Sequence, residues 1–144
     1  MVKNILFICK HNIFRSRTAE EFFKKYNKNK KYNSDSAGII KWDIKDLKNN
    51  IGYETEKKAV KNFGINLRAK SKGLSSSLLK KTDILIIVAD DVPISIFSDT
   101  SFWGKIIVWK ISDVKAIDKN KKEIALKTIE YIEDKVKNFV KNLK

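Results

Sequence analysis

The stretch VKNILFICKHNIFRS, residues 2–16, decides the fold of this chain. An apolar run, Val2 to Ile8, leads through a short loop into a segment with helical spacing, which predicts a strand, a loop and a helix in direct succession. Cys9, the only cysteine, stands where the strand ends, and Arg15 stands where the helix begins. A helix N-terminus favours a thiolate and binds a phosphate-like anion through its free N–H groups. The stretch therefore combines a nucleophile, an anion cradle and a guanidinium, which indicates phosphoryl transfer through cysteine.

The rest of the chain alternates between apolar strands and amphipathic helices. We predict further strands over residues 32–36, 84–89 and 105–109, and helices over residues 15–27, 54–63, 75–81 and from about 120 to the end. The last helix is expected to bury one face, made of Ala125, Ile129, Ile132, Val136, Phe139 and Leu143. This order predicts a single α/β domain over residues 1–144, with a parallel sheet of about four strands, helices on both faces, and a phosphate-binding loop after the first strand.

Residues that can do chemistry gather at one edge of the expected sheet. Ligands of parallel α/β sheets bind at the carboxyl ends of the strands. Cys9, Ser36, Asp90 and the loop 112–118 all lie at or just after the end of a predicted strand. We therefore expect the functional site at this edge, where Asp90 would either cap its own loop or brace the substrate side.

The composition disfavours several classes of protein. Hydrophobic residues make up 42% of the chain, which argues against disorder, and no apolar run reaches the roughly 18 residues of a membrane helix. The first apolar run is followed by charge and not by a small-residue cleavage site, so we interpret it as a strand rather than a signal peptide. One cysteine and one histidine disfavour a disulfide and a Cys or His metal site, so we expect no cofactor. An unpaired thiol fits the reducing cytoplasm, where we expect the protein, away from membranes.

The chain is strongly basic, with 31 Lys and Arg against 17 Asp and Glu and a net charge of +14. This charge predicts attraction to anions, including phosphorylated proteins, phosphate esters and nucleic acid. The densest group is Lys24, Lys25, Lys28, Lys30 and Lys31, at the expected end of the first helix, where cations suit the helix dipole. Because basic residues are spread over the whole length, we favour a solvated lysine-rich surface over a nucleic-acid patch.

The segment from Cys9 to Ser16 resembles the signature of the low-molecular-weight protein tyrosine phosphatase family: a cysteine, five residues, an arginine, then serine or threonine. Asn12 stands where the family has an asparagine that braces the loop, and Ser16 where it has a hydroxyl that assists the nucleophile. The similarity covers most of the chain. It continues in family order through Ser36-Ala37-Gly38, Trp42 at the spacing of a substrate-flanking aromatic, Gly64-Ile65-Asn66, the aliphatic strand before Asp90, and Ile111-Ser112-Asp113-Val114.

The resemblance implies a role for each matching residue. Cys9 would attack phosphorus to form a cysteinyl-phosphate, and Asp113 would protonate the leaving oxygen and then activate water. The phosphate would be held by Arg15 and by the loop residues Lys10, His11, Asn12, Ile13 and Phe14. Ser16 would bond the leaving thiolate, Asn12 and Ser36 would hold the loop in shape, and Trp42 would flank the substrate. The implied substrates are phosphotyrosine proteins or small phosphate esters.

The chain departs from the family pattern at several positions. Val114 replaces the proline that usually follows the catalytic aspartate, and the tyrosines that often come next are absent. Phe14 replaces a second loop cysteine that protects the nucleophile, so we expect peroxide to inactivate the protein without rescue by an internal disulfide. A histidine that supports the loop in many members is replaced near Lys70.

Structural roles and other functions compete with these assignments. A lone cysteine is often a small core residue, Asp113 would also suit a turn, Trp42 would also suit the core, and His11 is a better surface or supporting residue than a base. Some arsenate reductases share this fold and loop, and here such an activity would need external thiols because Cys9 has no cysteine partner. A catalytically weak module that binds anions or nucleic acid is the other alternative, against which the presence of Cys9, Arg15 and Asp113 argues.

Overall fold

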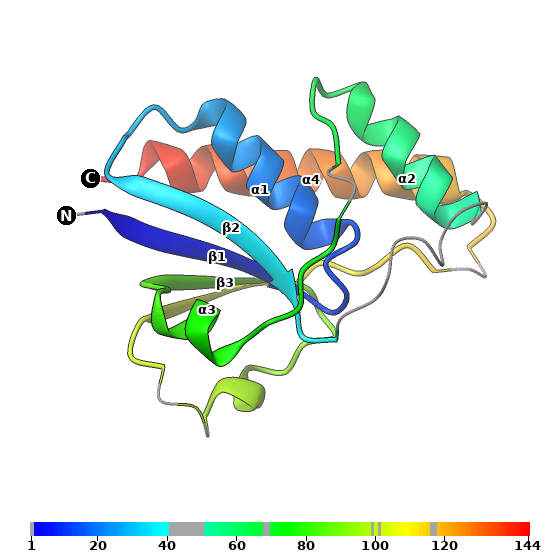
Figure 1. Cartoon of the computed structure of the whole chain (residues 1–144). Helices are drawn as coiled ribbons and strands as arrows, with labels where there is room; N and C mark the ends of the chain where they lie inside the picture. The colour runs from blue at the N-terminus through cyan, green and yellow to red at the C-terminus, as the bar shows by residue number, and fades with distance from the viewer. Residues whose placement is uncertain (1, 41–50, 68–69, 99, 101, 116–117) are drawn as a thin grey trace.

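The computed structural model describes residues 2–40, 51–67, 70–98, 100, 102–115 and 118–144 (Figure 1). The elements follow in the order β1 (Lys3–Cys9), α1 (Arg15–Tyr26), β2 (Tyr32–Gly38), α2 (Ile51–Lys61), α3 (Ser76–Lys80), β3 (Ile84–Val88), η2 (Ile94–Phe97), β4 (Lys105–Trp109) and α4 (Lys121–Lys141). The predicted alternation of strands and helices is confirmed, with boundaries that differ by a few residues. The 3₁₀ helix η2 was not predicted, because its four residues are too few to show a helical period.

The strands form one parallel sheet in the order β2-β1-β3-β4, which confirms the predicted fold class. Cys9 pairs with Gly38 across β1 and β2, and Val88 pairs with Trp109 across β3 and β4. Because all the strands run the same way, their carboxyl ends lie at one edge of the sheet. This edge is where the sequence places Cys9.

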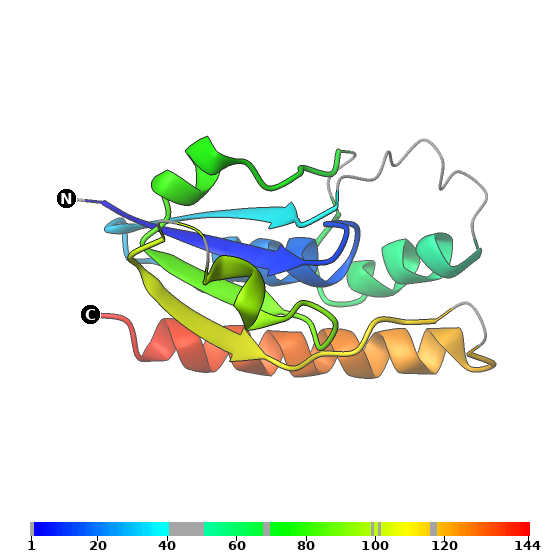
Figure 2. The same ribbon diagram turned by 90° about the horizontal axis from the view of Figure 1, so that it is seen from below.

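Helices cover both faces of the sheet (Figures 1 and 2). α1, α2 and α4 lie on one face, and α3 and η2 lie on the other. Side chains of β1 alternate between the two layers: Ile5 and Phe7 join the cluster with α1 and α4, whereas Leu6 and Ile8 join the cluster with α3 and η2. A strand that is covered on both faces must be apolar at every position, which explains the continuous run in the sequence.

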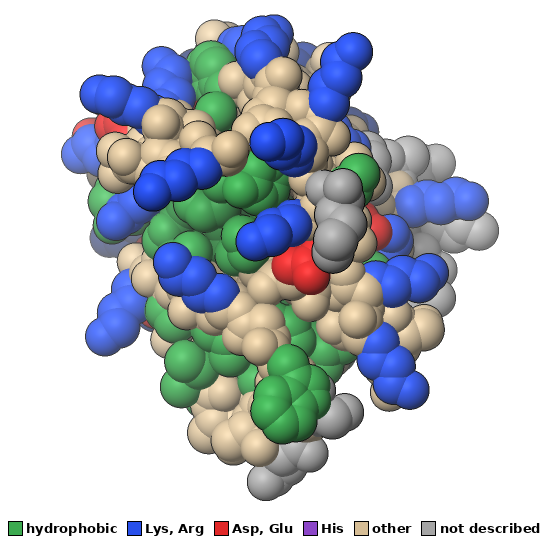
Figure 3. Space-filling view, turned by 90° about the vertical axis from the view of Figure 1, so that its left-hand side faces the viewer, with side chains coloured by type: hydrophobic (Ala, Val, Ile, Leu, Met, Phe, Trp, Pro, Cys, Tyr) green, Lys and Arg blue, Asp and Glu red, His purple; other side chains and the backbone are tan. Residues whose placement is uncertain are grey.

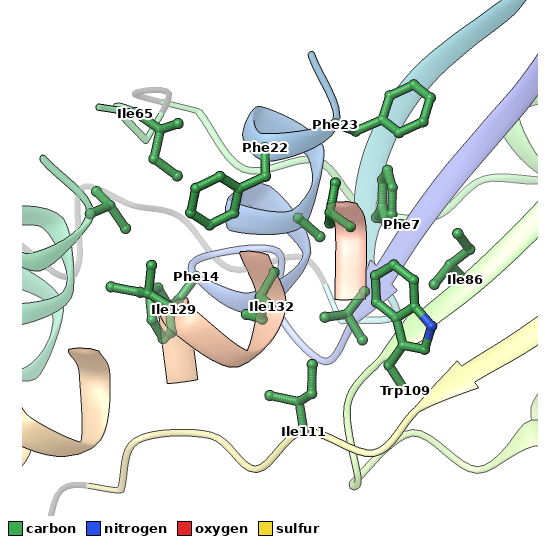
Figure 4. Packing of buried hydrophobic residues seen from close by; sticks show 14 of the residues in the cluster. Phe7, Phe14, Phe22, Phe23, Ile65, Ile86, Trp109, Ile111, Ile129 and Ile132 are labelled. Atoms are coloured by element: carbon green, nitrogen blue, oxygen red, sulfur yellow. The ribbon is translucent and has the colours of Figure 1, made fainter. Parts of the chain in front are cut away.

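Aromatic rings fill the larger of these two clusters (Figure 4). The ring of Phe7 lies 5.9 Å from that of Phe23 in α1 and 6.0 Å from that of Trp109 in β4, measured between centroids. Ile129 and Ile132 of α4 pack in the same cluster and are fully buried. Each such side chain stabilises the fold by about 1.5–3 kcal/mol, so α4 secures α1 and with it the start of the first helix.

Among the described residues, no helix has the length and apolar character needed to cross a membrane.

Candidate active site

The loop between β1 and α1 wraps back over the side chain of Cys9. Asn12 adopts a left-handed backbone conformation, with φ of 56°, and its N–H group points at the sulfur of Cys9 at 3.3 Å. α1 begins at Arg15 after Phe14, an N-cap residue whose side chain cannot accept a hydrogen bond. The N–H groups of this first turn therefore remain suited to an anion.

A hydroxyl group also faces the sulfur. The Oγ atom of Ser16 lies 3.0 Å from the Sγ atom of Cys9, and both residues are buried. The Nδ2 group of Asn12 donates to the same Oγ at 2.8 Å. Because Ser16 already accepts this bond, its own O–H is the natural donor toward Cys9.

Asn12 holds the loop together through its side chain, which is completely buried. Its Nδ2 group also donates to Ser36 at 2.9 Å, and its Oδ1 atom accepts the backbone N–H of Lys72 at 2.8 Å. Ser36 in turn donates to Glu20 at 2.6 Å, and Glu20 is paired with Lys24 at 3.0 Å. The backbone of Lys72 thus supports the loop. It lies close to Lys70, near which many members of the family have a supporting histidine.

Glu20 was missing from the sequence-based assignment, although a signal was present. It lies four residues after Ser16 and therefore on the same side of α1, facing β2. The segment after β2 also fastens the loop, because the N–H groups of Ile39 and Ile40 donate to the carbonyls of Cys9 and Lys10 at 3.2 and 2.9 Å.

Arg15 is almost fully buried, with 2% of its surface exposed, and it lies among carboxylates. Its Nη1 group donates to the carbonyl of Ile111 at 2.9 Å, and its two terminal nitrogens lie 3.0 and 3.2 Å from the carboxylate of Asp91. Asp90 and Asp113 each approach the guanidinium to 3.8 Å. Burial on its own would lower the pKa of Arg15, but the hydrogen bond to Asp91 and the negative charges of Asp113, Cys9 and Asp91 outweigh it and raise the pKa.

The two aspartates that follow β3 have different partners. Asp91, which sequence reasoning passed over in favour of Asp90, makes the closest ion pair with Arg15. Asp90 accepts the hydroxyl of Ser112 at 2.5 Å and so braces the loop after β4. Asp90 therefore links the loop after β3 to the loop after β4.

Asp113 reaches the site from the loop after β4. Its Oδ2 atom is 3.8 Å from Arg15, its Oδ1 atom accepts the N–H of Val114 at 3.0 Å, and its side chain is partly open to solvent. Val114 packs against the larger hydrophobic cluster and anchors the loop on its inner side. The predicted nucleophile, guanidinium and acid therefore meet at one edge of the sheet.

The remaining loop residues have different environments. The side chain of Phe14 lies in the core, so only its backbone faces the site. Lys10 and Ile13 are partly buried. Burial, then the charge of Lys10, lowers the pKa of His11, which therefore stays neutral near pH 7. Trp42, the expected flank of the substrate, lies outside the described residues.

One further buried carboxyl group was not predicted. Glu56 of α2 is buried, with 7% of its surface exposed. Burial, reinforced by Asp113 and opposed by Arg15, raises the pKa of Glu56 well above its ordinary value. The sequence carried a signal, because Glu56 falls on the apolar face of α2 between Tyr53 and Val60.

Fold and site define a class of α/β proteins in which a cysteine-centred anion loop joins the first strand to the first helix. The family model described as "Low molecular weight phosphotyrosine protein phosphatase" matches residues 4–144, so the chain belongs to this family. A comparison with curated proteins gave no significant match.

Several solved structures have the same fold at low sequence identity. A low-molecular-weight protein tyrosine phosphatase from T. tengcongensis is 23% identical, with a TM-score of 0.73 over 98% of this chain and 99% of that chain. An arsenate reductase from Archaeoglobus fulgidus is also 23% identical, with a TM-score of 0.72 over 96% of this chain and 99% of that chain. The YwlE arginine phosphatase, a Bacillus subtilis protein, is 20% identical, with a TM-score of 0.72 over 97% of this chain and 95% of that chain.

Proposed function

We propose that the protein is a phosphatase that hydrolyses phosphate monoesters, with phosphotyrosine in proteins as its favoured substrate. One observation carries the proposal: the sulfur of Cys9 lies 3.0 Å from a serine hydroxyl and 3.3 Å from a loop amide, beside a buried arginine that also faces Asp113. These are the parts that phosphoryl transfer through cysteine requires. Membership of the phosphatase family supports the same reaction.

In the first step the thiolate of Cys9 attacks phosphorus, an S–P bond forms, and the P–O bond to the leaving group breaks. Arg15 and the loop amides hold the equatorial oxygens of the phosphate. To do so, Arg15 must release its ion pair with Asp91 and bind the phosphate instead. Asp113 gives its proton to the leaving oxygen. In the second step Asp113 takes a proton from water, the water attacks phosphorus, and the S–P bond breaks. The hydroxyl of Ser16 bonds the departing thiolate.

Two features favour an aryl phosphate on an acidic protein. Cys9 is only 2% exposed, so the phosphate must enter the loop, and a tyrosine phosphate reaches further than a serine phosphate. Lysine side chains are spread, with hydrophobic surface between them, over the face at the left of Figure 1 (Figure 3), which is the end where the strands begin and lies opposite the candidate site. The net charge of +14 of the whole chain would nevertheless attract acidic segments of a substrate. Such substrates are found in the cytoplasm, which is the location we propose.

The experiment is hydrolysis of para-nitrophenyl phosphate by the native protein and three variants, with a chelator present. We expect turnover to disappear in Cys9→Ser and to fall by roughly 10²–10⁴-fold in Asp113→Asn, the usual range for a general acid. Asp134→Asn, a matched change at an exposed position of α4, should have no effect. No turnover by folded, reduced native protein would contradict the proposal.

Comparison of tyrosine, serine and arginine phosphopeptides then tests the substrate class. Preference for phosphoarginine would favour an arginine phosphatase, the activity given in the name of the YwlE arginine phosphatase. Arsenate reduction is the second candidate, because an arsenate reductase has a TM-score of 0.72 with this chain. With one cysteine in the chain, that activity would depend on an added thiol or thioredoxin, which a direct assay decides.

A further inference from the structure

β2 lies at one edge of the sheet, and the chain covers only the last part of its outer side. The N–H group of Gly38 donates to the carbonyl of Lys72 at 2.8 Å, and the carbonyl of Gly38 accepts the N–H group of Leu74 at 2.8 Å. The chain then leaves this edge at Ser75, where α3 is capped. Because backbone groups alternate in direction along a strand, Ser34 turns its N–H and carbonyl groups to the same outer side as Gly38. Within the described part of the chain, neither group of Ser34 has a hydrogen-bond partner.

A cavity of 710 Å³ lies along this open part of β2, and we call it the β2 groove. Residues 32–35 of β2 line it, with Phe23 of α1 on one side and Leu78 of α3 on the other. These two helices lie on opposite faces of the sheet (Figure 1). The β2 groove therefore combines an unpaired strand edge with apolar side chains on both faces, which are the two features that an added strand requires.

The charges that line the β2 groove are mainly positive. They are those of Lys24, Lys72 and Lys81, against the single carboxylate of Asp35. Lys72 pairs with Asp35 at 2.6 Å and so neutralises it, and Lys24 pairs with Glu20 at 3.0 Å. Within the described residues, no ion pair engages Lys81. The β2 groove therefore favours a partner that brings negative charge.

More lysines surround the start of β2. The loop from α1 to β2 carries Lys28, Lys30 and Lys31, all of them exposed and all part of the densest basic group in the sequence. On this face of the molecule, hydrophobic surface lies between the lysine side chains (Figure 3). The face is opposite the candidate active site, so the proposed reaction gives these lysines no direct role.

Charge alone would suit a nucleic acid as well as an acidic peptide. The backbone of Ser34 distinguishes the two, because it presents a donor and an acceptor side by side. An extended peptide offers an acceptor and a donor in return, whereas a phosphate group offers acceptors only and would be repelled by the carbonyl. The open edge therefore favours a peptide.

We propose that the β2 groove binds an extended acidic segment of a partner protein, which adds to β2 as a further strand. Backbone hydrogen bonds would join the segment to Ser34. Since successive side chains of a strand point to opposite faces, its apolar residues would pack beside Phe23 or Leu78 and its carboxylates would meet Lys81 and the lysines before β2. This binding uses no residue of the candidate active site, so the inference does not rest on the proposed reaction.

The test measures, by fluorescence anisotropy at low salt, the binding of a labelled peptide of about eight residues in which valine alternates with glutamate. A second peptide has the same sequence with its central amides N-methylated, so it keeps its charge but lacks the donors that strand pairing needs. The variants are Lys81→Glu, in the β2 groove, and Lys58→Glu, the same change at an exposed position of α2 that does not line the groove.

We expect Lys81→Glu to bind the peptide roughly fivefold more weakly than the native protein, and Lys58→Glu to differ by less than about twofold. N-methylation of the peptide should weaken binding by roughly tenfold. Hydrogen exchange at the amide of Ser34 should slow when the unmodified peptide is bound to the native protein.

Equal binding of the two peptides would overturn the proposal, because charge alone would then explain the interaction. Equal losses in Lys58→Glu and Lys81→Glu, unchanged exchange at Ser34, or absence of binding to the native protein would overturn it as well. A single-stranded oligonucleotide of equal charge serves as a competitor, and tighter binding of the oligonucleotide would make the surface a nucleic-acid site instead. Peptide binding without turnover of para-nitrophenyl phosphate would count against the phosphatase reaction and leave the role of the β2 groove supported.

Discussion

Asn12 should be the polar residue whose loss most weakens the loop around Cys9. The change Asn12→Ala removes three side-chain hydrogen bonds of 2.8, 2.9 and 2.8 Å, to Ser16, Ser36 and the backbone of Lys72. At a net value of about 1 kcal/mol each, these bonds amount to roughly 3 kcal/mol. Alanine also tolerates the left-handed φ of 56° less well than asparagine, which adds up to about 1 kcal/mol. The free energy of unfolding should therefore fall by roughly 3–4 kcal/mol, a large share of the 5–15 kcal/mol typical of a domain.

Equilibrium unfolding in urea measures this loss, and a glycine variant separates its two causes. Asn12→Gly loses the same hydrogen bonds but accepts the left-handed backbone without strain. The free energy of unfolding lost in Asn12→Gly therefore reports the hydrogen bonds, and that lost in Asn12→Ala reports the hydrogen bonds together with the backbone strain. Asn33→Ala, at an exposed position of β2, serves as the matched control and should change the free energy of unfolding by less than about 0.5 kcal/mol. The reasoning is refuted when Asn12→Ala unfolds at the same urea concentration as the native protein, or when Asn12→Ala and Asn33→Ala cost the same.

Three further predictions concern other parts of the site. Because the pKa of Glu56 is raised in the folded state, the contribution of this one group to stability is fully present below about pH 4.5 and is lost as the pH rises. The stability of Glu56→Gln relative to native should therefore grow with pH in urea unfolding, and a difference that stays constant would contradict this. In Gly38→Ala the new Cβ would lie 2.5 Å from the carbonyl carbon of His11. The free energy of unfolding should therefore fall by roughly 1–3 kcal/mol, and the affinity for anions should fall with it. Unchanged affinity for anions would show that the loop shifts to accept the Cβ without losing its shape. Peroxide should inactivate the protein by oxidising Cys9, its only cysteine, and activity should return only with an added thiol; spontaneous recovery would speak against this.

The local part of the site could be predicted from the sequence because its residues are close together along the chain. Cys9, Asn12, Arg15 and Ser16 share one strand-loop-helix segment, and the strand and helix that flank it have clear apolar periods. A short spacing on a regular element leaves little freedom in where the side chains lie. The structure accordingly brings the sulfur of Cys9 to within 3.0 Å of Ser16 and 3.3 Å of the amide of Asn12.

Residues that act across elements could not be predicted in this way. Asp91 pairs with Arg15 across 76 positions, and nothing in its local sequence distinguishes it from its neighbour Asp90. Phe14 belongs to the loop in sequence, but its side chain packs in the core. Glu56 reads as one more charge on a lysine-rich helix until the packing of that helix makes it a buried group.

The sequence by itself determined the order of strands and helices, the parallel sheet and the phosphate-type loop, because each of these depends on periodicity and spacing within a few residues. Only the tertiary structure decided which carboxylates meet Arg15. Asp90, Asp91 and Asp113 come from the segments that follow β3 and β4, and they approach one guanidinium only once the sheet has formed and α4 has packed against α1 and α2. These contacts depend on distances through space, which no local stretch of the chain contains.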